Sequence, residues 1–448
     1  MREEERTPMA AKLLIIQPSH YRSRSNLTPY KAKRRTVVPL TLPYLAGLTP
    51  KEWNVTLIDE QLTGIDFKAP VDLVAITTWT INSFRAYEIA DRFRERKVPV
   101  IMGGPHAYFY SGEAAEHCDA VGIGEGENIW ATMLEDAAAG HLKKIYRADH
   151  LQNLGNLPLP RYDLLNLRGF SLFKTFSVQT SRGCPFKCDF CSERFYLGPN
   201  YRYRPVQDVI AEIKQNRAKN ILFADSNFAG NTAHTMELME ALIPLKVRWS
   251  TLWSAYLCNN KEFMDLAKRS GLLHVNIGIE SIDQGTLNGL NKKMNKAKQY
   301  KEMLNNLRKR GISYSLNFLF GWDTEKEDVF DATLTFLKQE KVPVAYFNIL
   351  TPHKGTPLYD RMNAENRIID TYHMGRWPGI HCYIKPTYCS EGELEEHVRK
   401  IYREFYTFSS IFARLPWPVT QAHIASWVVN LSERKMSRAD AGMDFDAY

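Results

Sequence analysis

Three cysteines lie close together in the middle of the chain, at Cys184, Cys188 and Cys191, with the spacing C-x3-C-x2-C. A strand-like run at 176–180 precedes them, and Gly183 and Pro185 flank the first, so we expect a tight loop at the end of a strand. In such a loop, three sulfur atoms can converge on one inorganic centre. Structural zinc sites use four protein ligands, whereas iron-sulfur clusters are held by thiolates. Three cysteines without a nearby histidine therefore predict a cluster with one iron open to a substrate or cosubstrate. A zinc knuckle that lacks its fourth ligand and three unrelated thiols are the alternatives.

From the cysteine loop onward, strand and helix patterns alternate about six times. This alternation is typical of a parallel sheet with right-handed crossovers. Eight units would close a full barrel, so six predict a partial (β/α)6 barrel over 175–355, with its site at the carboxyl ends of the strands. The expected strands are 176–180, 220–224, 247–252, 273–279, 313–320 and 344–350, and the expected helices are 206–216, 232–243, 261–269, 296–310 and 326–339.

The cysteine loop, with the aromatic Phe190 just before its third cysteine, resembles the signature of the radical S-adenosylmethionine (radical SAM) superfamily. The resemblance implies a 4Fe-4S cluster on the three thiolates, with the amino and carboxylate groups of SAM on the open iron. It also implies that residues at three later strand ends bind SAM. These are Asp225 and Asn227 for the amino group, Glu280 and Ser281 for the ribose or the methionine moiety, and Phe320 and Gly321 against the adenine.

Residues 1–145 predict an α/β domain with a doubly wound parallel sheet in front of the barrel. Apolar runs at 13–16, 55–58, 73–76, 98–102 and 120–123 are typical of buried parallel strands, and 83–96 has the pattern of an amphipathic helix. Polar and glycine-rich residues follow several strand ends, where ligands bind in such sheets. The arrangement resembles the cobalamin-binding domain fused to many radical SAM enzymes. It implies contacts to cobalamin from Thr77, Thr78, Gly103, Gly104, Gly124 and Glu125.

The loop after the first strand departs from one version of that domain. Domains that bind cobalt through histidine carry Asp-x-His-x-x-Gly there, whereas residues 18–23 of this chain read Pro-Ser-His-Tyr-Arg-Ser. We therefore expect cobalamin to bind without a protein histidine ligand, and His20, His106 and His117 to have other roles. The alternative is a degenerate domain that binds no corrin and only shapes the substrate cavity.

The remaining segments carry weaker patterns. Residues 146–174 hold two closely spaced prolines and no clean periodicity, so we expect a linker. Residues 350–359 are rich in proline and glycine and resemble a loop that closes the active site in relatives of this type. Residues 356–448 predict a helical segment, with one amphipathic helix at 391–414 that Pro416 and Pro418 end, and a second at 420–435 with Trp427 on its apolar side. Packing on the barrel is the simpler account of these helices, and peripheral membrane contact is the alternative.

Composition limits the class of protein. With 448 residues, 44% of them apolar, the chain can form two cores and is not disordered. It contains no run of about 18 apolar residues and no apolar N-terminal segment, so we expect no transmembrane helix, no signal peptide and a cytoplasmic location. The net charge of +8 is dispersed except at 31–35, which we expect to be a solvated loop, and no motif indicates a nucleic-acid partner. Cys118, Cys258, Cys382 and Cys389 match no metal spacing, and Cys258 is the one that could face a substrate.

The whole architecture resembles the cobalamin-dependent (class B) radical SAM proteins, which include hopanoid and bacteriochlorophyll C-methyltransferases. The resemblance implies reductive cleavage of SAM to a 5'-deoxyadenosyl radical, with an electron donor such as flavodoxin or ferredoxin. The leading hypothesis is a radical C-methyltransferase that acts on a hydrophobic small molecule, a lipid or a tetrapyrrole. The alternatives are a radical SAM oxidoreductase or cyclase without methyl transfer, and a non-catalytic iron-sulfur or electron-transfer protein.

Overall fold

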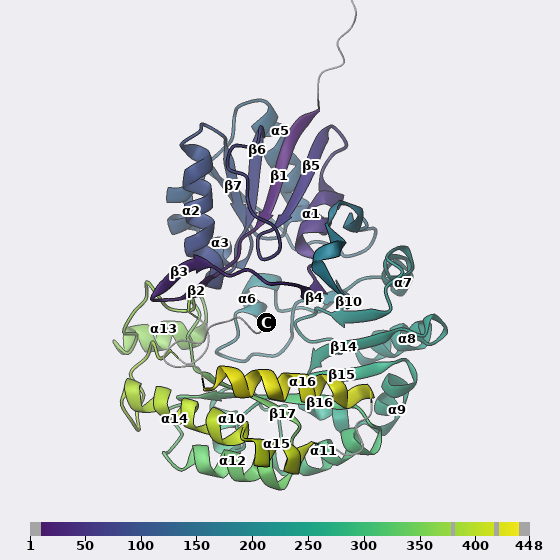
Figure 1. Ribbon diagram of the computed structural model, residues 1–448, viewed down its shortest axis with the longest axis vertical. Helices are drawn as coiled ribbons and strands as arrows, with labels where there is room; N and C mark the ends of the chain where they lie inside the picture. The colour runs from purple at the N-terminus through teal and green to yellow at the C-terminus, as the bar shows by residue number, and fades with distance from the viewer. Residues whose placement is uncertain (1–9, 378–380, 416–420, 439–448) are drawn as a thin grey trace, which may run out of the picture. The chain divides into compact units, whose positions relative to one another are not determined.

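The computed structural model describes residues 10–377, 381–415 and 421–438, which form two compact units (Figure 1). The first unit contains Thr28–Arg35, Pro39–Ser171 and the described residues before Arg22. The second contains Arg22–Leu27, Thr36–Val38 and the described residues from Leu172 onward.

The first unit is built on a six-stranded parallel sheet with the order β5-β1-β6-β7-β8-β9. All five predicted strands are present, because a parallel sheet covered on both faces needs strands that are apolar throughout. The sixth strand was not predicted, since only Tyr146 of its three residues is buried. The strands are β1 (Ala11–Gln17), β5 (Trp53–Asp59), β6 (Leu73–Thr77), β7 (Val100–Gly103), β8 (Ala120–Ile123) and β9 (Ile145–Arg147).

Helices cover this sheet, and the apolar side of α2 joins its core. Ala86, Ile89, Ala90 and Phe93 of α2 pack in one cluster with strand residues such as Ile76. The strand order reverses between β1 and β6, the place where doubly wound sheets bind ligands. The helices are α1 (Thr41–Leu48), α2 (Ser83–Arg94), α3 (Pro105–Phe109), α4 (Ser111–His117) and α5 (Trp130–Ala138), and β2 (Tyr21–Ser23) pairs with β3 (Asn26–Pro29).

The second unit holds a seven-stranded sheet with the order β17-β16-β15-β14-β13-β10-β4, in which β10 to β17 are parallel. All six predicted barrel strands are present, so the partial barrel is confirmed. The edge strand β4 was not predicted, because most of the sequence of the first unit separates its four residues from β10, the strand with which it pairs. The strands are β4 (Arg35–Val38), β10 (Phe170–Val178), β13 (Asn220–Phe223), β14 (Arg248–Trp253), β15 (Leu272–Glu280), β16 (Ser313–Phe320) and β17 (Val344–Ile349).

The helices between these strands lie along the outer side of the curved sheet (Figure 1). Five were predicted: α7 (Val206–Gln215), α8 (Thr232–Leu242), α9 (Lys261–Arg269), α11 (Tyr300–Lys309) and α12 (Val329–Gln339). Three short helices were not: α6 (Glu193–Leu197), α10 (Gln284–Gly289) and α13 (Pro357–Ala364), the last of which begins inside the predicted loop. The short strands β11 (Ser181–Arg182) and β12 (Arg202–Tyr203) pair antiparallel on either side of the cysteine loop.

The described residues from 391 onward form three helices where the sequence predicted two: α14 (Glu391–Phe405), α15 (Phe408–Arg414) and α16 (Gln421–Met436). The single helix predicted at 391–414 is wrong, because Thr407 has an extended backbone and its Oγ1 accepts a hydrogen bond from Ser410 N at 3.3 Å, which starts a new helix. The stop predicted at Pro416 and Pro418 lies outside the described residues. None of the helices in the described ranges is long and apolar enough to cross a membrane.

Candidate functional site

The backbone around Gly183 fixes the start of the cysteine loop. Gly183 has φ +83, and a Cβ atom there would lie 2.2 Å from the Asn200 carbonyl oxygen. The same neighbouring segment holds the next residue, because Cys184 N donates a hydrogen bond to Gly198 O at 3.2 Å. Only glycine permits this close packing, so the residue before the first cysteine determines where the loop can lie.

A buried carboxylate anchors the turn from β10 into the cysteine loop. Asp225 Oδ1 accepts hydrogen bonds from Thr180 N at 2.7 Å and Ser181 N at 3.1 Å. Its Oδ2 accepts from the hydroxyls of the same two residues. Burial raises the pKa of Asp225, and the bonds from Thr180 and Ser181 oppose this rise. Both oxygens are thus used within the protein, so Asp225 positions the loop, whereas the sequence predicted a contact to SAM.

The three thiols of the loop are half-buried and close enough to interact electrostatically. Burial raises the pKa of Cys184, and it raises the pKa of Cys188 to about 11 and of Cys191 to about 12. The charge of Cys184 adds to the rise in the pKa of Cys188, and the charges of Cys184 and Cys188 add to the rise in the pKa of Cys191. A cationic metal centre reverses this preference, because thiolates are its ligands.

Three thiols on one loop form a donor set that fits an iron-sulfur cluster, because such clusters are held by cysteine thiolates. Within the described ranges, no three His, Cys, Asp or Glu side chains are grouped so that they could hold a single ion.

Asn227 is the predicted site residue with the clearest capacity for a ligand. Its side chain is 3% exposed, and neither its amide oxygen nor its amide nitrogen has a hydrogen-bond partner. An amide buried without partners costs free energy, so such a group in a native site calls for an explanation. A bound ligand with both a donor and an acceptor would supply one. Its neighbour Ser226 donates to Glu193 Oε2 at 2.5 Å, which ties this strand end to α6 directly after the cysteine loop.

The predicted pair at the end of β15 has an unusual backbone. Glu280 has φ +59 in the left-handed region and lies at a register shift in the β15–β16 pairing. Its carboxylate forms an ion pair with Lys292, whose ammonium lies 5.7 Å from the centre of the Phe190 ring. Ser281 Oγ accepts a hydrogen bond from Asp283 N at 3.1 Å. The strain is held beside the cysteine loop, where backbone outliers commonly mark functional sites.

At the end of β16 the two predicted residues separate in role. The Phe320 ring packs on Phe330 and Phe347 in the core, so a contact to adenine could come only from its backbone. Gly321 N donates to Glu325 Oε2 at 2.8 Å, and Trp322 N donates to the same oxygen at 3.0 Å. Burial raises the pKa of Glu325 to about 7. Sequence reasoning missed Glu325, although a carboxylate five residues beyond a predicted strand end was a signal for it.

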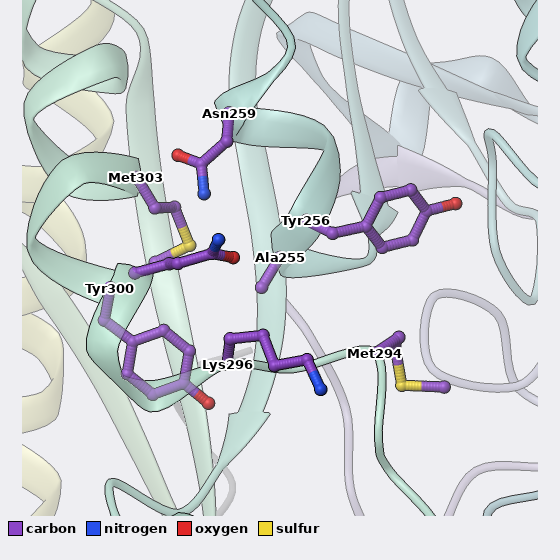
Figure 2. Close-up of a pocket in the computed structure, with 8 residues that line it drawn as sticks. Ala255, Tyr256, Asn259, Met294, Lys296, Tyr300 and Met303 are labelled. Carbon is purple, nitrogen blue, oxygen red and sulfur yellow. The ribbon is translucent and has the colours of Figure 1, made fainter.

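A small pocket lies between the segments that follow β14 and β15 (Figure 2). Its empty space is about 170 Å³, a value that includes open solvent. Tyr256 connects the pocket to the cysteine loop, since its ring lies edge-on to Phe186 with centroids 6.2 Å apart. Sequence reasoning missed this pocket, although the strand-end rule pointed to residues just after 253. Its lining comprises Ala255, Tyr256, Asn259, Met294, Lys296, Gln299, Tyr300 and Met303.

In the first unit, the predicted cobalamin residues gather at the carboxyl edge of the sheet. Thr77 ends β6, and the adjacent Thr78 is fully buried with no partner for its hydroxyl. Gly103 ends β7, and Gly104 has φ +100 with its ideal Cβ 2.8 Å from Thr78 O. The glycine at 104 is thus required by the neighbouring loop, whether or not a ligand is present.

The last predicted pair of the first unit is also shaped by internal packing. Gly124 has φ +101, and a Cβ there would lie 2.8 Å from the Ala148 side chain. Glu125 is 6% exposed, and its carboxylate accepts a hydrogen bond from Gln152 N at 2.5 Å. The glycines therefore indicate tight turns, and the unpartnered Thr78 hydroxyl is the stronger signal for a ligand.

Three histidines of the first unit that the sequence assigned no cofactor role are engaged within the protein. His20 Nδ1 lies 3.0 Å from Tyr21 O, and its ring stacks on Tyr30. His106 is fully buried, with Nε2 2.7 Å from the Tyr87 hydroxyl. His117 Nδ1 lies 2.9 Å from Asp91 Oδ2. These contacts give each ring a structural role.

Two other expectations change with the structure. The basic run is only partly solvated, because Lys31 donates to the Glu60 carbonyl and Arg35 pairs with Asp59. Cys258 is fully buried, and burial raises its pKa to about 12, so it does not face a substrate. Cys118 is also buried.

Comparison with known proteins identifies the barrel. A family model described as the radical SAM superfamily matches residues 178–337. The bacteriochlorophyllide d C-12(1)-methyltransferase of Chlorobaculum tepidum is 29% identical over 438 residues, covering 95% of this chain and 94% of that protein. The hopanoid C-2 methylase of Rhodopseudomonas palustris is 24% identical over 355 residues, covering 74% of this chain and 65% of that protein.

A solved structure shows the same fold over most of the chain. The cobalamin-dependent S-adenosylmethionine radical enzyme OxsB, with aqua-cobalamin and S-adenosylmethionine bound, has a TM-score of 0.70 and 16% sequence identity. The match covers 95% of this chain and 71% of that one. The chain therefore carries a radical SAM domain at residues 178–337 and is a homologue of bacteriochlorophyllide methyltransferases and hopanoid methylases.

Proposed function

We propose that this chain is a cobalamin-dependent radical SAM C-methyltransferase that acts on a hydrophobic small molecule. The observation that carries the proposal is the site at the carboxyl edge of the half-barrel. There, three half-buried thiols share one loop, and the next strand end presents the buried, unpartnered amide of Asn227. Cys184, Cys188 and Cys191 hold a 4Fe-4S cluster in this proposal, and Asn227 binds a polar group of SAM.

The protein's own residues orient the reacting groups. Asp225 holds Thr180 and Ser181, and thus the direction in which the cysteine loop leaves β10. The Glu280–Lys292 pair places one carboxylate and one cation beside the cysteines. When bound, the cluster and SAM supply a strong acceptor of hydrogen atoms, and cobalamin supplies the methyl group. The Phe190 ring packs against Trp322 with their centroids 5.5 Å apart, which helps to fix the position of the cysteine loop.

The first unit is the proposed cobalamin domain. Its sheet has the doubly wound order, and the unpartnered Thr78 hydroxyl lies at the strand ends beside the switch point. His20 is engaged with Tyr21 and Tyr30, so cobalt would have no histidine ligand from this chain. OxsB binds aqua-cobalamin in a structure of the same fold, which supports the assignment.

The substrate class follows from the relatives. The two relatives described above are named for methylation of a bacteriochlorophyllide and of a hopanoid. We infer a substrate of this kind, with a one-electron donor such as flavodoxin or ferredoxin to reduce the cluster. A cytoplasmic location stays a prediction.

Anaerobic isolation from cobalamin-fed cells tests the cofactors. We expect about four iron atoms and one cobalt per chain, since each cysteine would bind one iron of a 4Fe-4S cluster. Reaction with SAM, a reductant and candidate tetrapyrroles or lipids should give a product heavier by one methyl group. A dehydrogenated or cyclised product without added methyl would contradict methyl transfer, and a colourless protein that holds zinc would contradict the cluster.

Alanine variants test the ligands one at a time. Replacing Cys184, Cys188 or Cys191 should abolish both the cluster absorbance and SAM cleavage. Cys382→Ala is the matched control, because Cys382 is also half-buried but lies outside the loop. Retained SAM cleavage in any of the three loop variants would refute the assignment.

A further inference from the structure

Within the second unit, the helix α16 packs against the ends of β16 and β17 through polar side chains. Ser426, Asn430 and Glu433 are 2%, 0% and 4% exposed and lie on one side of the helix. Ser426 Oγ is 3.0 Å from Ser313 Oγ at the start of β16, and Asn430 Nδ2 donates to Pro343 O at 2.9 Å just before β17. This inward face is the opposite of the usual pattern, in which apolar residues face the core.

The outward face of α16 is apolar. Ile424, Val428 and Leu431 are 54%, 63% and 50% exposed, and their spacing of four and three places them on one stripe. Isolated exposed apolar residues are common, but a continuous stripe is not needed for folding and indicates an interaction surface.

Two phenylalanines of α15 extend this stripe. Phe412 is 67% exposed, and its ring lies edge-on to Trp427 at 5.3 Å. Phe408 is 51% exposed, and the Arg434 guanidinium lies 3.7 Å from its ring centre. The apolar patch thus comprises five large side chains from two neighbouring helices: Phe408, Phe412, Ile424, Val428 and Leu431.

Three cations lie beside the apolar patch among the described residues: Arg434, Lys435 and Arg438. Lys435 continues the exposed stripe at the next position, Arg438 follows it, and both side chains are exposed. Arg434 lies at the side, over Phe408. The one acidic residue of α16 is the buried Glu433, and the sequence from Phe405 to Leu415 contains none.

We propose that the apolar patch binds the surface of a membrane that contains anionic lipids. The five apolar side chains would enter the boundary of the acyl region, while Lys435, Arg438 and Arg434 meet the lipid phosphates. A second copy of the chain fits this surface less well, because a two-fold contact would bring together cations with no carboxylate on the patch to pair with them. The proposal does not depend on the cofactors or on methyl transfer.

Vesicle flotation of the full-length chain under anaerobic conditions tests this. The chain should float with vesicles of phosphatidylcholine and phosphatidylglycerol, and much less with phosphatidylcholine alone. Ile424→Gln/Val428→Gln/Leu431→Gln should weaken binding at least about tenfold, because three apolar side chains no longer enter the lipid. Glutamine is a good helix former, so α16 should remain folded, which circular dichroism and the melting temperature check.

Two further variants separate the contributions. Leu172→Gln/Phe173→Gln is the matched control, since these side chains are 82% and 74% exposed on β10, and it should bind as the wild type does. Lys435→Gln/Arg438→Gln should weaken binding to anionic vesicles by about fivefold for each charge removed. Added salt should also weaken the binding of the wild type to these vesicles. Equal flotation with both vesicle types, or unchanged binding of the triple variant, would overturn the proposal. So would a dimer in light scattering that the triple variant dissociates while vesicles bind neither form.

Discussion

Replacing Gly183 by alanine should displace the cysteine loop while the second unit stays folded. The left-handed φ of +83 costs a residue with a Cβ about 1–2 kcal/mol. The contact to Asn200 O must also open from 2.2 Å to the ordinary limit of 3.4 Å, a movement of about 1.2 Å. The new Cβ would in addition lie 3.0 Å from Gly198 O, which accepts the hydrogen bond from Cys184 N. Functional sites tolerate displacements of roughly 0.5 Å, so cluster assembly should fail before folding does.

The measurement is iron and sulfide content with the visible spectrum after anaerobic reconstitution, beside the melting temperature. Gly183→Ala should lose most of its iron and most SAM cleavage, with only a small loss in melting temperature. Gly140→Ala is the matched control, because Gly140 also has a positive φ, +72, but has no atom within 4 Å of its ideal Cβ. It carries the same backbone strain without the collision and should keep its iron. A Gly183→Ala protein with wild-type iron content and SAM cleavage would refute the reasoning.

Three further changes have defined outcomes. Glu325→Gln should flatten the pH dependence of stability. The folded pKa of about 7 lies above the ordinary value of 4.5, so the stabilisation from this group, about 3 kcal/mol, is complete below about pH 4.5 and is lost by about pH 7. If the melting temperature of the variant changes between pH 5 and 8 as that of the wild type does, this reasoning is wrong. Asn227→Ala should weaken SAM binding about tenfold in equilibrium dialysis at unchanged melting temperature, and wild-type affinity would exclude the contact. Arg414→Met should destabilise the chain by about 3–5 kcal/mol in denaturant unfolding, because the buried guanidinium donates to Val342 O, Pro343 O and Phe405 O; a loss below about 1 kcal/mol would show that these carbonyls find other donors.

Strand and helix alternation made most of the fold predictable. The barrel strands are apolar and regularly spaced, so five of the six predicted ranges agree with the structure to within one residue at each end. The exception is β10, which begins at Phe170, six residues before its predicted start and inside the predicted linker. The predictions failed where an element depends on a partner far along the chain, or where the apolar pattern hides a break in the backbone. β4 pairs with a strand far along the chain, and nothing within its four residues records that partner. The break at Thr407 was hidden because the apolar spacing continues through it.

The candidate site was predictable to the level of strand ends, but not to the level of individual side chains. Asp225 and Asn227 follow a predicted strand, and the structure places both at the carboxyl edge of the sheet. Only the structure shows that the Asp225 carboxylate accepts hydrogen bonds from Thr180 and Ser181, whereas the Asn227 amide has no hydrogen-bond partner. Similarly, Gly104 and Gly124 have the conformations that glycine allows, but neighbouring protein atoms account for them. The sequence predicted that α16 packs on the barrel through its apolar side, since apolar side chains usually face the core. This is wrong for α16, because Ser426 and Asn430 on its opposite side bind to residues next to β16 and β17.

The edge strand β4 has a consequence for how this protein can be divided. Residues 36–38 belong to the second unit although they are flanked in sequence by residues of the first. A fragment that starts at Leu172 would leave the hydrogen-bonding edge of β10 bare, and bare edges recruit foreign strands and aggregate. Genetic separation of the two units would therefore require that the short β4 segment be grafted onto the second unit.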